Sequence, residues 1–297
     1  PKLFGCNEDF YEIEIDKNDI IVDAVFGIGL NRPPNNWVQN LFQKLKESTA
    51  FTLAIDVPSG LYTDQPVEDP DAVVHANFTL SFQSPKLVFF LPETSRFSGQ
   101  WEVLDIGIDR DYLIQTETEV ELIAKNEVLP IYKPRDKFSH KGNFGHALIL
   151  GGSYGKIGAV NLASSAALSS GAGKVTAYVP KCGYEILQTN IPEAMVITDN
   201  DEREITTINF DLEPTVIGLG IGLGTSEKTS NALKEFLKKN KSSLVIDADG
   251  LNIVSKNKEL LKHLPENSIL TPHPKELQRL IGEWSDDFDK LKKAKAF

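Results

Sequence analysis

Asp19-Ile-Ile-Val-Asp-Ala-Val-Phe-Gly-Ile-Gly-Leu30 has the pattern of a buried strand that ends in a glycine-rich turn. Large apolar residues then recur at helical spacing over residues 37–48. Phe51-Thr-Leu-Ala-Ile-Asp-Val-Pro-Ser-Gly60 follows as a second apolar strand, which its proline and glycine stop. A strand, a helix and a strand in this order predict a βαβ unit, and therefore a parallel sheet.

The second half of the chain repeats this alternation with its own elements. Residues 109–145 between the halves are polar and hold few long apolar runs, so we assign 1–113 and 114–297 to two domains. In the first half we expect further strands at 77–82, 86–91 and 100–106. In the second half we expect strands at 146–150, 174–180, 215–219, 243–247 and 268–271, with helices at 157–170 and 227–239. The fold class predicted for both domains is α/β.

The overall composition is that of a globular protein, with 41% hydrophobic and 25% charged residues among 297. Acidic residues outnumber basic ones by 42 to 31, and the net charge of −11 argues against a nucleic-acid partner. No apolar run approaches the roughly 20 residues of a membrane span, so we expect no membrane partner.

The cysteines and the first residue add two expectations. Cys6 and Cys182 lie far apart without metal-ligand spacing, so we expect no disulfide framework and a reducing, cytoplasmic location. We also expect no signal peptide. Pro1 is not an initiator and the only methionine is Met195, so we expect the sequence to be a piece of a longer protein.

The candidate ligand-binding residues follow the predicted strands, at the edge where open α/β sheets bind their ligands. In the first domain, Asp23 stands late in its strand, and Gly27 and Gly29 allow a phosphate to approach the backbone, with Arg32 as counter-charge. Asp56 and Ser59 follow the next strand and offer oxygen ligands to a hard cation, or an acid or base. A tight turn with an exposed arginine and a capping aspartate explain the same residues equally well.

In the second domain, three glycine or carboxylate motifs occupy equivalent places. Gly151-Gly-Ser-Tyr-Gly155 lacks the ending of a P-loop, and the small residues after it let a helix lie close to the sheet or to a flat ligand. Gly220-Ile-Gly-Leu-Gly224 is a possible anion-binding turn. Asp247-Ala-Asp-Gly-Leu-Asn252 fits a metal-nucleotide or hydroxyl site, and it fits simple helix capping as well.

Thr271-Pro-His-Pro274 holds a histidine between two prolines, just after the last predicted strand. A rigidly presented imidazole there can face the crevice at the strand ends and hydrogen-bond a ligand. We expect its loss to weaken ligand binding and to leave the melting temperature nearly unchanged, whereas a structural histidine would show the opposite.

Together these motifs resemble, in order, those of the bifunctional NAD(P)H-hydrate repair enzymes. In that family an NAD(P)H-hydrate epimerase domain of Rossmann-like three-layer fold precedes an ADP-dependent (S)-NAD(P)H-hydrate dehydratase domain of ribokinase-like α/β/α fold. The stretches at 23–30 and 56–60 resemble the epimerase, and those at 140–142, 151–155, 220–224, 247–252 and 271–274 resemble the dehydratase. The resemblance covers nearly the whole chain and implies that both domains are partial.

The resemblance also implies site residues. Asp56 would be the catalytic residue of the epimerase and would contact the hydrated nicotinamide nucleotide. Asp23 and Ser59 would bind potassium. The other substrate-binding residues implied are Gly27, Ile28, Gly29, Leu30, Asn31, Arg32 and Pro33 in the first domain, and Ala159, Gly222 and His273 in the second.

The sequence departs from the family at both ends. The family's epimerase begins with a helix and an Asn-Asn-Gly loop, and its dehydratase ends with Lys-Gly and Gly-Thr-Gly-Asp loops. None of these is present here, so we expect the base of the dehydratase to lie outside this chain, and we assign no nucleotide-binding residue.

The function implied is the repair of hydrated NADH and NADPH by epimerisation of the R and S hydrates and nucleotide-dependent dehydration of the S epimer. ADP or ATP, potassium and magnesium are the implied cofactors, and we expect a homo-oligomer. The alternatives are a ribokinase-like kinase for a vitamin or sugar, which would have no use for the motifs at 23–60, and a non-catalytic nucleotide-binding module.

Overall fold

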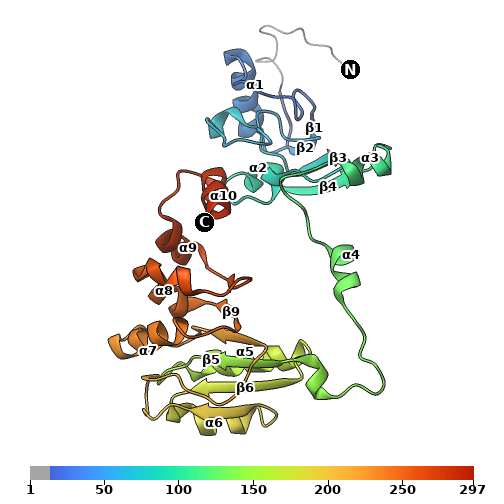
Figure 1. The fold of residues 1–297 in the computed structure, drawn as a ribbon. Helices are drawn as coiled ribbons and strands as arrows, with labels where there is room; N and C mark the ends of the chain where they lie inside the picture. Colours follow the sequence, from blue (N-terminus) through green and yellow to red (C-terminus); the bar gives the residue numbers. More distant parts are fainter. Residues whose placement is uncertain (1–13) are drawn as a thin grey trace. The chain divides into compact units, whose positions relative to one another are not determined.

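The structure is a computed structural model that describes residues 14–297 (Figure 1). Cys6 lies outside the described residues. Contacts between residues divide the chain into two compact units, and we describe each by itself. The first unit runs to Ile131 and includes Trp284–Ala296; the second spans Tyr132–Glu283. The boundary between the units lies between residues 131 and 132, and the last helix of the chain belongs to the first unit. The domain boundary expected from the sequence, between residues 113 and 114, stays a prediction.

The first unit holds a parallel sheet of four strands in the order β1-β2-β3-β4. Its strands are β1 (Ile20–Asp23), β2 (Phe51–Ile55), β3 (Phe78–Phe82) and β4 (Gln100–Leu104). Helix α1 (Asn36–Glu47) connects β1 with β2 and begins where the Asn35 side chain accepts from the Val38 N–H. The predicted βαβ unit is therefore confirmed.

The strand expected at 86–91 is wrong, because the chain forms a short 3-10 helix there, η3 (Leu87–Phe89). Val88 and Phe89 are buried, and they pack with Val57, Leu61 and Phe97 into a core that also contacts Trp101 of β4. The apolar run that suggested a strand belongs to this core. The remaining short helices of the unit are η2 (Pro70–Ala72), α2 (Ser95–Ser98), α3 (Arg110–Gln115), α4 (Lys125–Val128) and η4 (Leu129–Ile131).

Helix α10 (Asp287–Ala296) completes the first unit. Its Phe288 packs against the same core. The Glu93 N–H donates to Asp287 Oδ2 at 3.0 Å, and the Asp287 N–H donates to Glu93 Oε2 at 3.1 Å. This reciprocal pair holds the start of α10 on the first unit.

The second unit holds a parallel sheet of six strands in the order β10-β9-β8-β5-β6-β7. The strands are β5 (His146–Leu150), β6 (Lys174–Val179), β7 (Met195–Thr198), β8 (Val216–Leu219), β9 (Ser243–Ile246) and β10 (Ile269–Leu270). From β5 the chain proceeds to β6 and β7 on one side, and it then returns to β8 on the other. The strand order thus reverses between β5 and β8, which is the place where open α/β sheets bind ligands.

Alternate residues of β5 face two different cores. Leu148 and Leu150 pack with α7 (Glu227–Leu237) and α8 (Ala248–Lys256). Ala147 and Ile149 pack with α5 (Ile157–Ser169) and α6 (Tyr184–Asn190). Because side chains of a strand alternate between its faces, the sheet is covered by helices on both sides. The other helices are η5 (Lys141–Phe144), η6 (Lys181–Gly183), η7 (Lys258–His263) and α9 (Pro274–Ile281).

The predicted α/β class is confirmed in both units. Strand β7, which pairs in parallel with β6 at the sheet edge, was not predicted from the sequence. No helix between residues 14 and 297 combines the length and apolarity needed to cross a bilayer.

Candidate functional site

Two predicted residues of the first unit, Asp23 and Ser59, form a buried pair across the ends of β1 and β2. Asp23 Oδ1 accepts from the Ser59 hydroxyl at 2.6 Å, and Oδ2 accepts from the Ser59 N–H at 2.7 Å. Ser59 Oγ in turn accepts from the Phe26 N–H at 2.8 Å. Burial raises the pKa of Asp23, although its hydrogen bonds with Ser59 and Val25 act in the opposite direction. The donors that reach this carboxylate are uncharged, so they do not neutralise it.

Asp56 occupies an unusual backbone conformation directly after β2. Its φ is +70°, a region that residues other than glycine rarely adopt. Asp56 Oδ2 accepts from the Ile28 N–H at 3.3 Å, and Oδ1 accepts from the Phe82 N–H at 3.4 Å. The carboxylate thus connects the glycine-rich turn after β1 with the end of β3. Strain of this kind is found preferentially at functional sites.

The predicted substrate loop lies beside this carboxylate. A Cβ on Gly27 would stand 3.1 Å from Asp56 Oδ2, which explains why a residue without a side chain is suited to this position. The Leu30 N–H donates to the Gly27 carbonyl at 3.4 Å and closes the turn. Five other residues of the predicted substrate loop are exposed: Ile28, Gly29, Asn31, Arg32 and Pro33.

A cavity of about 520 Å³ opens at Asp56. Its apolar wall includes Ile28, Phe82 and Leu87. The polar residues that line it are Asp56, Thr63, Asp64, Gln83, Ser84 and Lys86. Of these polar residues, only Asp56 was predicted from the sequence. The rule that ligand residues follow the strands would have found Gln83, Ser84 and Lys86, because these residues come directly after β3.

In the second unit, the structure brings Ala159 and Gly222 together. Gly222 has a φ of +60°, and a Cβ on it would stand 2.7 Å from the Lys156 carbonyl and 3.5 Å from the Ala159 Cβ. Ser153 Oγ donates to the Gly222 carbonyl at 2.8 Å. The two glycine-rich loops therefore touch each other where the strand order reverses.

Gly151 and Gly220 also stand where the backbones of neighbouring loops approach closely. A Cβ on Gly151 would stand 2.3 Å from the Ile221 carbonyl, and the Gly152 N–H donates to that carbonyl at 2.8 Å. Gly220 has a φ of +111°, and a Cβ on it would come within 2.0 Å of the Asp247 carbonyl. The approach of three loops is thus possible because glycines stand at the points of contact.

Asp249 joins these loops through its side chain. Its Oδ2 accepts from the Gly224 N–H at 2.9 Å and lies 3.5 Å from Lys156 Nζ, and its Oδ1 accepts from Asn252 at 3.4 Å. Arg279 donates to Asn252 Oδ1 at 2.6 Å. In this structure the Asp-Ala-Asp-Gly-Leu-Asn motif therefore ties α8 and α9 to the loop after β8.

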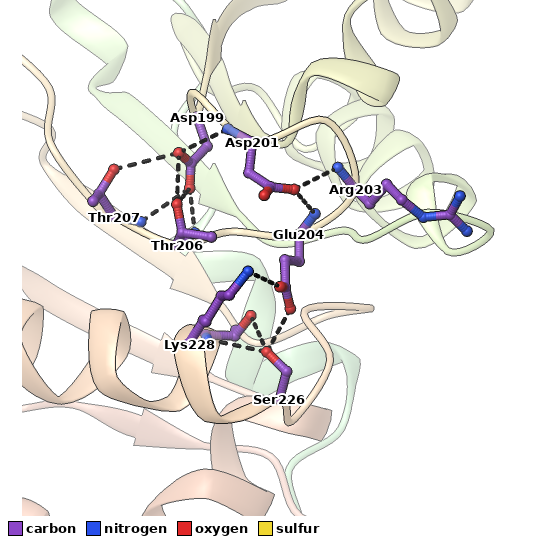
Figure 2. Close-up of polar contacts among 9 residues, drawn as sticks. Asp199, Asp201, Arg203, Glu204, Thr206, Thr207, Ser226 and Lys228 are labelled. Carbon is purple, nitrogen blue, oxygen red and sulfur yellow. Dashed lines mark hydrogen bonds and ion pairs between the residues drawn. The ribbon is translucent and has the colours of Figure 1, made fainter.

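The sequence patterns did not single out the loop at residues 199–207, whose polar contacts Figure 2 shows. Its Arg203 carbonyl accepts from the Tyr154 N–H of the first glycine-rich loop at 2.8 Å. Its first residue, Asp199, is 1% exposed. Burial of Asp199 acts to raise its pKa, but backbone N–H donors including Thr207, Thr206 and Asp201 outweigh burial and lower it. An ionised Asp199 therefore organises this loop from the inside.

The loop also contacts the first residues of helix α7 through Glu204. Figure 2 shows that Glu204 contacts Ser226 and Lys228. Glu204 accepts from the Ser226 hydroxyl at 2.5 Å and lies 3.5 Å from Lys228 Nζ. The Arg203 guanidinium stacks 3.8 Å from the centre of the Tyr154 ring. A cavity of about 390 Å³ is lined by Tyr154, Arg203, Glu204 and Ser226. Its other lining residues are Ser153, Leu223, Gly224, Thr225 and Thr229.

His273 caps helix α9. Its Nδ1 accepts from the N–H groups of Lys275 at 3.1 Å and Glu276 at 3.3 Å, while the Glu276 side chain accepts from the His273 N–H at 3.0 Å. The imidazole is 58% exposed, and its Nε2 lies 3.4 Å from Glu276 Oε1. The expectation that loss of His273 leaves stability unchanged is therefore revised, because an alanine would remove this cap.

Each unit thus has the arrangement of open α/β proteins that bind a small ligand at the carboxyl ends of parallel strands. The family model described as NAD(P)H-hydrate dehydratase matches residues 147–297, and the YjeF-related protein N-terminus matches residues 4–88. The chain belongs to the NAD(P)H-hydrate dehydratase family.

Relatives of known sequence share both parts. Bifunctional NAD(P)H-hydrate repair enzymes of Coxiella burnetii and Escherichia coli are each 32% identical, covering 90% and 89% of this chain and 53% and 49% of their own length. The chain spans about half the length of these curated relatives. Among solved structures, the ADP/ATP-dependent NAD(P)H-hydrate dehydratase of Bacillus subtilis, co-crystallised with ATP and Mg²⁺, is 25% identical, with a TM-score of 0.47 over 61% of each chain.

Proposed function

We propose that a protein carrying this chain repairs hydrated NADH and NADPH. The first unit would contribute to epimerisation of the R and S hydrates, and the second to nucleotide-dependent dehydration of the S epimer. Membership of the dehydratase family and the match of residues 4–88 to a second family support this assignment. The observation that carries it is Asp56, a carboxylate with a φ of +70° that lines a cavity of about 520 Å³ beside the glycine-rich turn.

The chemistry of epimerisation explains why one carboxylate is useful at this place. The hydrated ring carries a hydroxyl on the carbon next to the ring nitrogen, and inversion there requires the bond between that carbon and the nitrogen to break and form again. Asp56 would take up the hydroxyl proton as this bond breaks, which leaves an aldehyde on the carbon and the electron pair of the bond on the nitrogen, and it would return the proton on closure. The apolar wall of Ile28, Phe82 and Leu87 would accept the ring and exclude water from it.

We further propose that Asp23 and Ser59 hold a potassium ion. They offer a carboxylate and a hydroxyl oxygen on adjacent strand ends, and the uncharged donors around Asp23 leave its negative charge for a cation to balance. The described residues 14–297 include no group of three His, Cys, Asp or Glu side chains able to hold a metal. A carboxylate and a hydroxyl supply oxygen ligands, which hard cations prefer.

In the second unit, Ala159, Gly222 and His273 would line the pocket for the hydrated ring. Ala159 and Gly222 lie near the reversal of strand order between β5 and β8, whereas His273 follows the edge strand β10. Hydroxide is a poor leaving group, and an ADP or ATP with magnesium would supply the phosphoryl group that improves it. Our assignment of its base to a segment outside this chain stays a prediction. So do the homo-oligomer and the cytoplasmic location.

The test uses a full-length protein that carries this sequence and a mixture of the two NADPH hydrates. We expect the S hydrate to return to NADPH only when ADP or ATP is added, and the R hydrate to be consumed through the S form. Asp56→Asn should lower the rate at which the R hydrate is consumed by about 100-fold or more, and it should leave the rate of dehydration of the S hydrate unchanged. Phosphorylation of a vitamin or sugar without any NADPH formation would replace this proposal with the kinase alternative.

The 297-residue chain by itself provides a second check. If the base lies outside it, the purified chain forms no NADPH from the S hydrate in the presence of a nucleotide. Turnover by this chain would contradict our placement of the base.

A further inference from the structure

Lys86 is a nearly buried cation at the end of β3, in the wall of the Asp56 cavity. Its side chain is 14% exposed, and Nζ lies 3.5 Å from Asp56 Oδ1. The residue itself is fixed from the other side, because it begins the 3-10 helix η3, whose Val88 and Phe89 are buried. A lysine is seldom buried unless its charge is paired.

The three protons of the ammonium group are directed at one turn. Nζ donates to Ser81 Oγ at 3.1 Å, to the Phe82 carbonyl at 2.9 Å and to the Ser84 carbonyl at 2.8 Å. An ammonium group has three donors, so these bonds use all of them. Lys86 is therefore not placed to give a proton to a ligand.

The turn that Lys86 holds is strained. Gln83, at its centre, has a φ of +62°, and the Ser84 N–H donates to the Phe82 carbonyl at 2.7 Å. The same turn supplies the Phe82 N–H that donates to Asp56. Two residues other than glycine with positive φ, Asp56 and Gln83, thus line one cavity from adjacent strand ends, and Lys86 contacts the segments of both.

We propose that Lys86 is a positioning residue of this site: it holds the turn at residues 81–84 and, through that turn and its own charge, fixes the Asp56 carboxylate toward the cavity. The inference rests on the proposed epimerase function. The orientation of Asp56 would then depend on Lys86, a cation that makes no contact with the substrate.

The test compares three variants of the full-length protein. Lys86→Met removes the charge and the three hydrogen bonds with little change in side-chain length. Lys86→Arg keeps the charge but cannot direct three tetrahedral donors at the turn. Lys46→Met is the matched control, because Lys46 is also in the first unit and pairs with Asp71 at 2.5 Å, away from the cavity lining.

We expect Lys86→Met to lower the kcat for epimerisation by about 100-fold, as a misplacement of roughly 1 Å can do, with KM unchanged. Lys86→Arg should restore part of kcat, and Lys46→Met should behave as the unmodified protein. The amide NMR signal of Ile28, whose N–H donates to Asp56, should move in Lys86→Met and in Asp56→Asn but not in Lys46→Met.

An unmoved Ile28 signal in folded Lys86→Met overturns the inference, and so does an unchanged kcat. If Lys86→Met does not fold, the same two measurements on Lys86→Arg decide, and wild-type values there overturn the inference. Failure of the proposed function looks different, because Asp56→Asn would then epimerise normally. The Ile28 signal reports the positioning of Asp56 independently of any activity.

Discussion

The candidate site of the first unit is formed by side chains, and that of the second unit is formed mainly by the backbone. In the first unit, Asp23 is paired with Ser59, and Asp56 with Lys86. In the second unit, Gly151, Gly220 and Gly222 stand where loops approach too closely for a Cβ. The first site should therefore respond to the loss of a functional group, and the second to the addition of a single carbon.

In each unit the candidate site lies at the carboxyl edge of that unit's own parallel sheet. A site made of carboxylates and an ammonium group handles protons and charge at one point. A site made of glycine turns exposes backbone over a wider surface, which suits a flat ring or a phosphate. This division agrees with a proposed proton transfer in the first unit and the proposed binding of a ring and a nucleotide in the second.

The largest expected effect is that of a carbon added to Gly220. Gly220→Ala meets the Asp247 carbonyl at 2.0 Å and the Gly250 N at 2.7 Å at a φ of +111°, so we expect a loss of at least about 3 kcal/mol in the free energy of unfolding of the second unit. Far-UV circular dichroism during urea unfolding measures it. The tryptophans, Trp37, Trp101 and Trp284, belong to the first unit, so their fluorescence midpoint should stay in place.

The matched control is Gly158→Ala. A Cβ there meets nothing within 4 Å, and Gly158 lies in helix α5, so this change should stabilise the unit by about 0.5 to 1 kcal/mol. If both variants unfold alike, close backbone approach does not determine the structure of the second site.

The next effect concerns the charge of Asp23, whose pKa is raised by burial. Below the ordinary aspartate value both the folded and unfolded chains are protonated; as the pH rises, the unfolded chain loses its proton first. The free energy of unfolding should therefore fall from about pH 4 up to the folded pKa, and Asp23→Asn should remove this dependence. Urea unfolding of both proteins across this pH range measures the difference.

Potassium should reverse that loss in the unmodified protein. At neutral pH, potassium at ten times its Kd would add about 1.4 kcal/mol to the free energy of unfolding, and Asp23→Asn should gain nothing. Tetramethylammonium chloride controls for ionic strength. Equal gains from both salts would contradict a potassium site at Asp23 and Ser59.

The sequence predicted what depends on local patterns. The apolar runs that become β1, β2, β5 and β8 end in glycine or in a carboxylate, and the structure confirms these strands. It also places Ala159 beside Gly222, and Asp23 against Ser59. The resemblance to the repair enzymes had implied both pairs, and they meet because parallel strands end at the same edge of a sheet.

What the sequence did not predict depends on contacts between distant residues. The apolar run of Leu87, Val88 and Phe89 indicates a strand that would include Lys86, and only the core with Phe97 shows that this run is a helical turn. The bonds that place α10 on the first unit join Glu93 to Asp287, 194 positions apart. No local periodicity carries such information.

The smallest expected effect separates the two roles of His273. His273→Ala loses both the cap of α9 and the Nε2 atom, so we expect a loss of about 1 kcal/mol in the free energy of unfolding as well as weaker binding of the hydrated cofactor. His273→Asn keeps a side-chain acceptor that can cap the helix, so its melting temperature should stay close to that of the unmodified protein. Because one hydrogen bond contributes about 0.5 to 1.5 kcal/mol, its affinity for the hydrated cofactor should fall by up to about tenfold. Calorimetric binding and thermal unfolding of both variants in the full-length protein measure the two roles separately. Wild-type affinity in His273→Asn would leave His273 with the cap alone, and the pocket of the second unit would then be defined by its glycine loops.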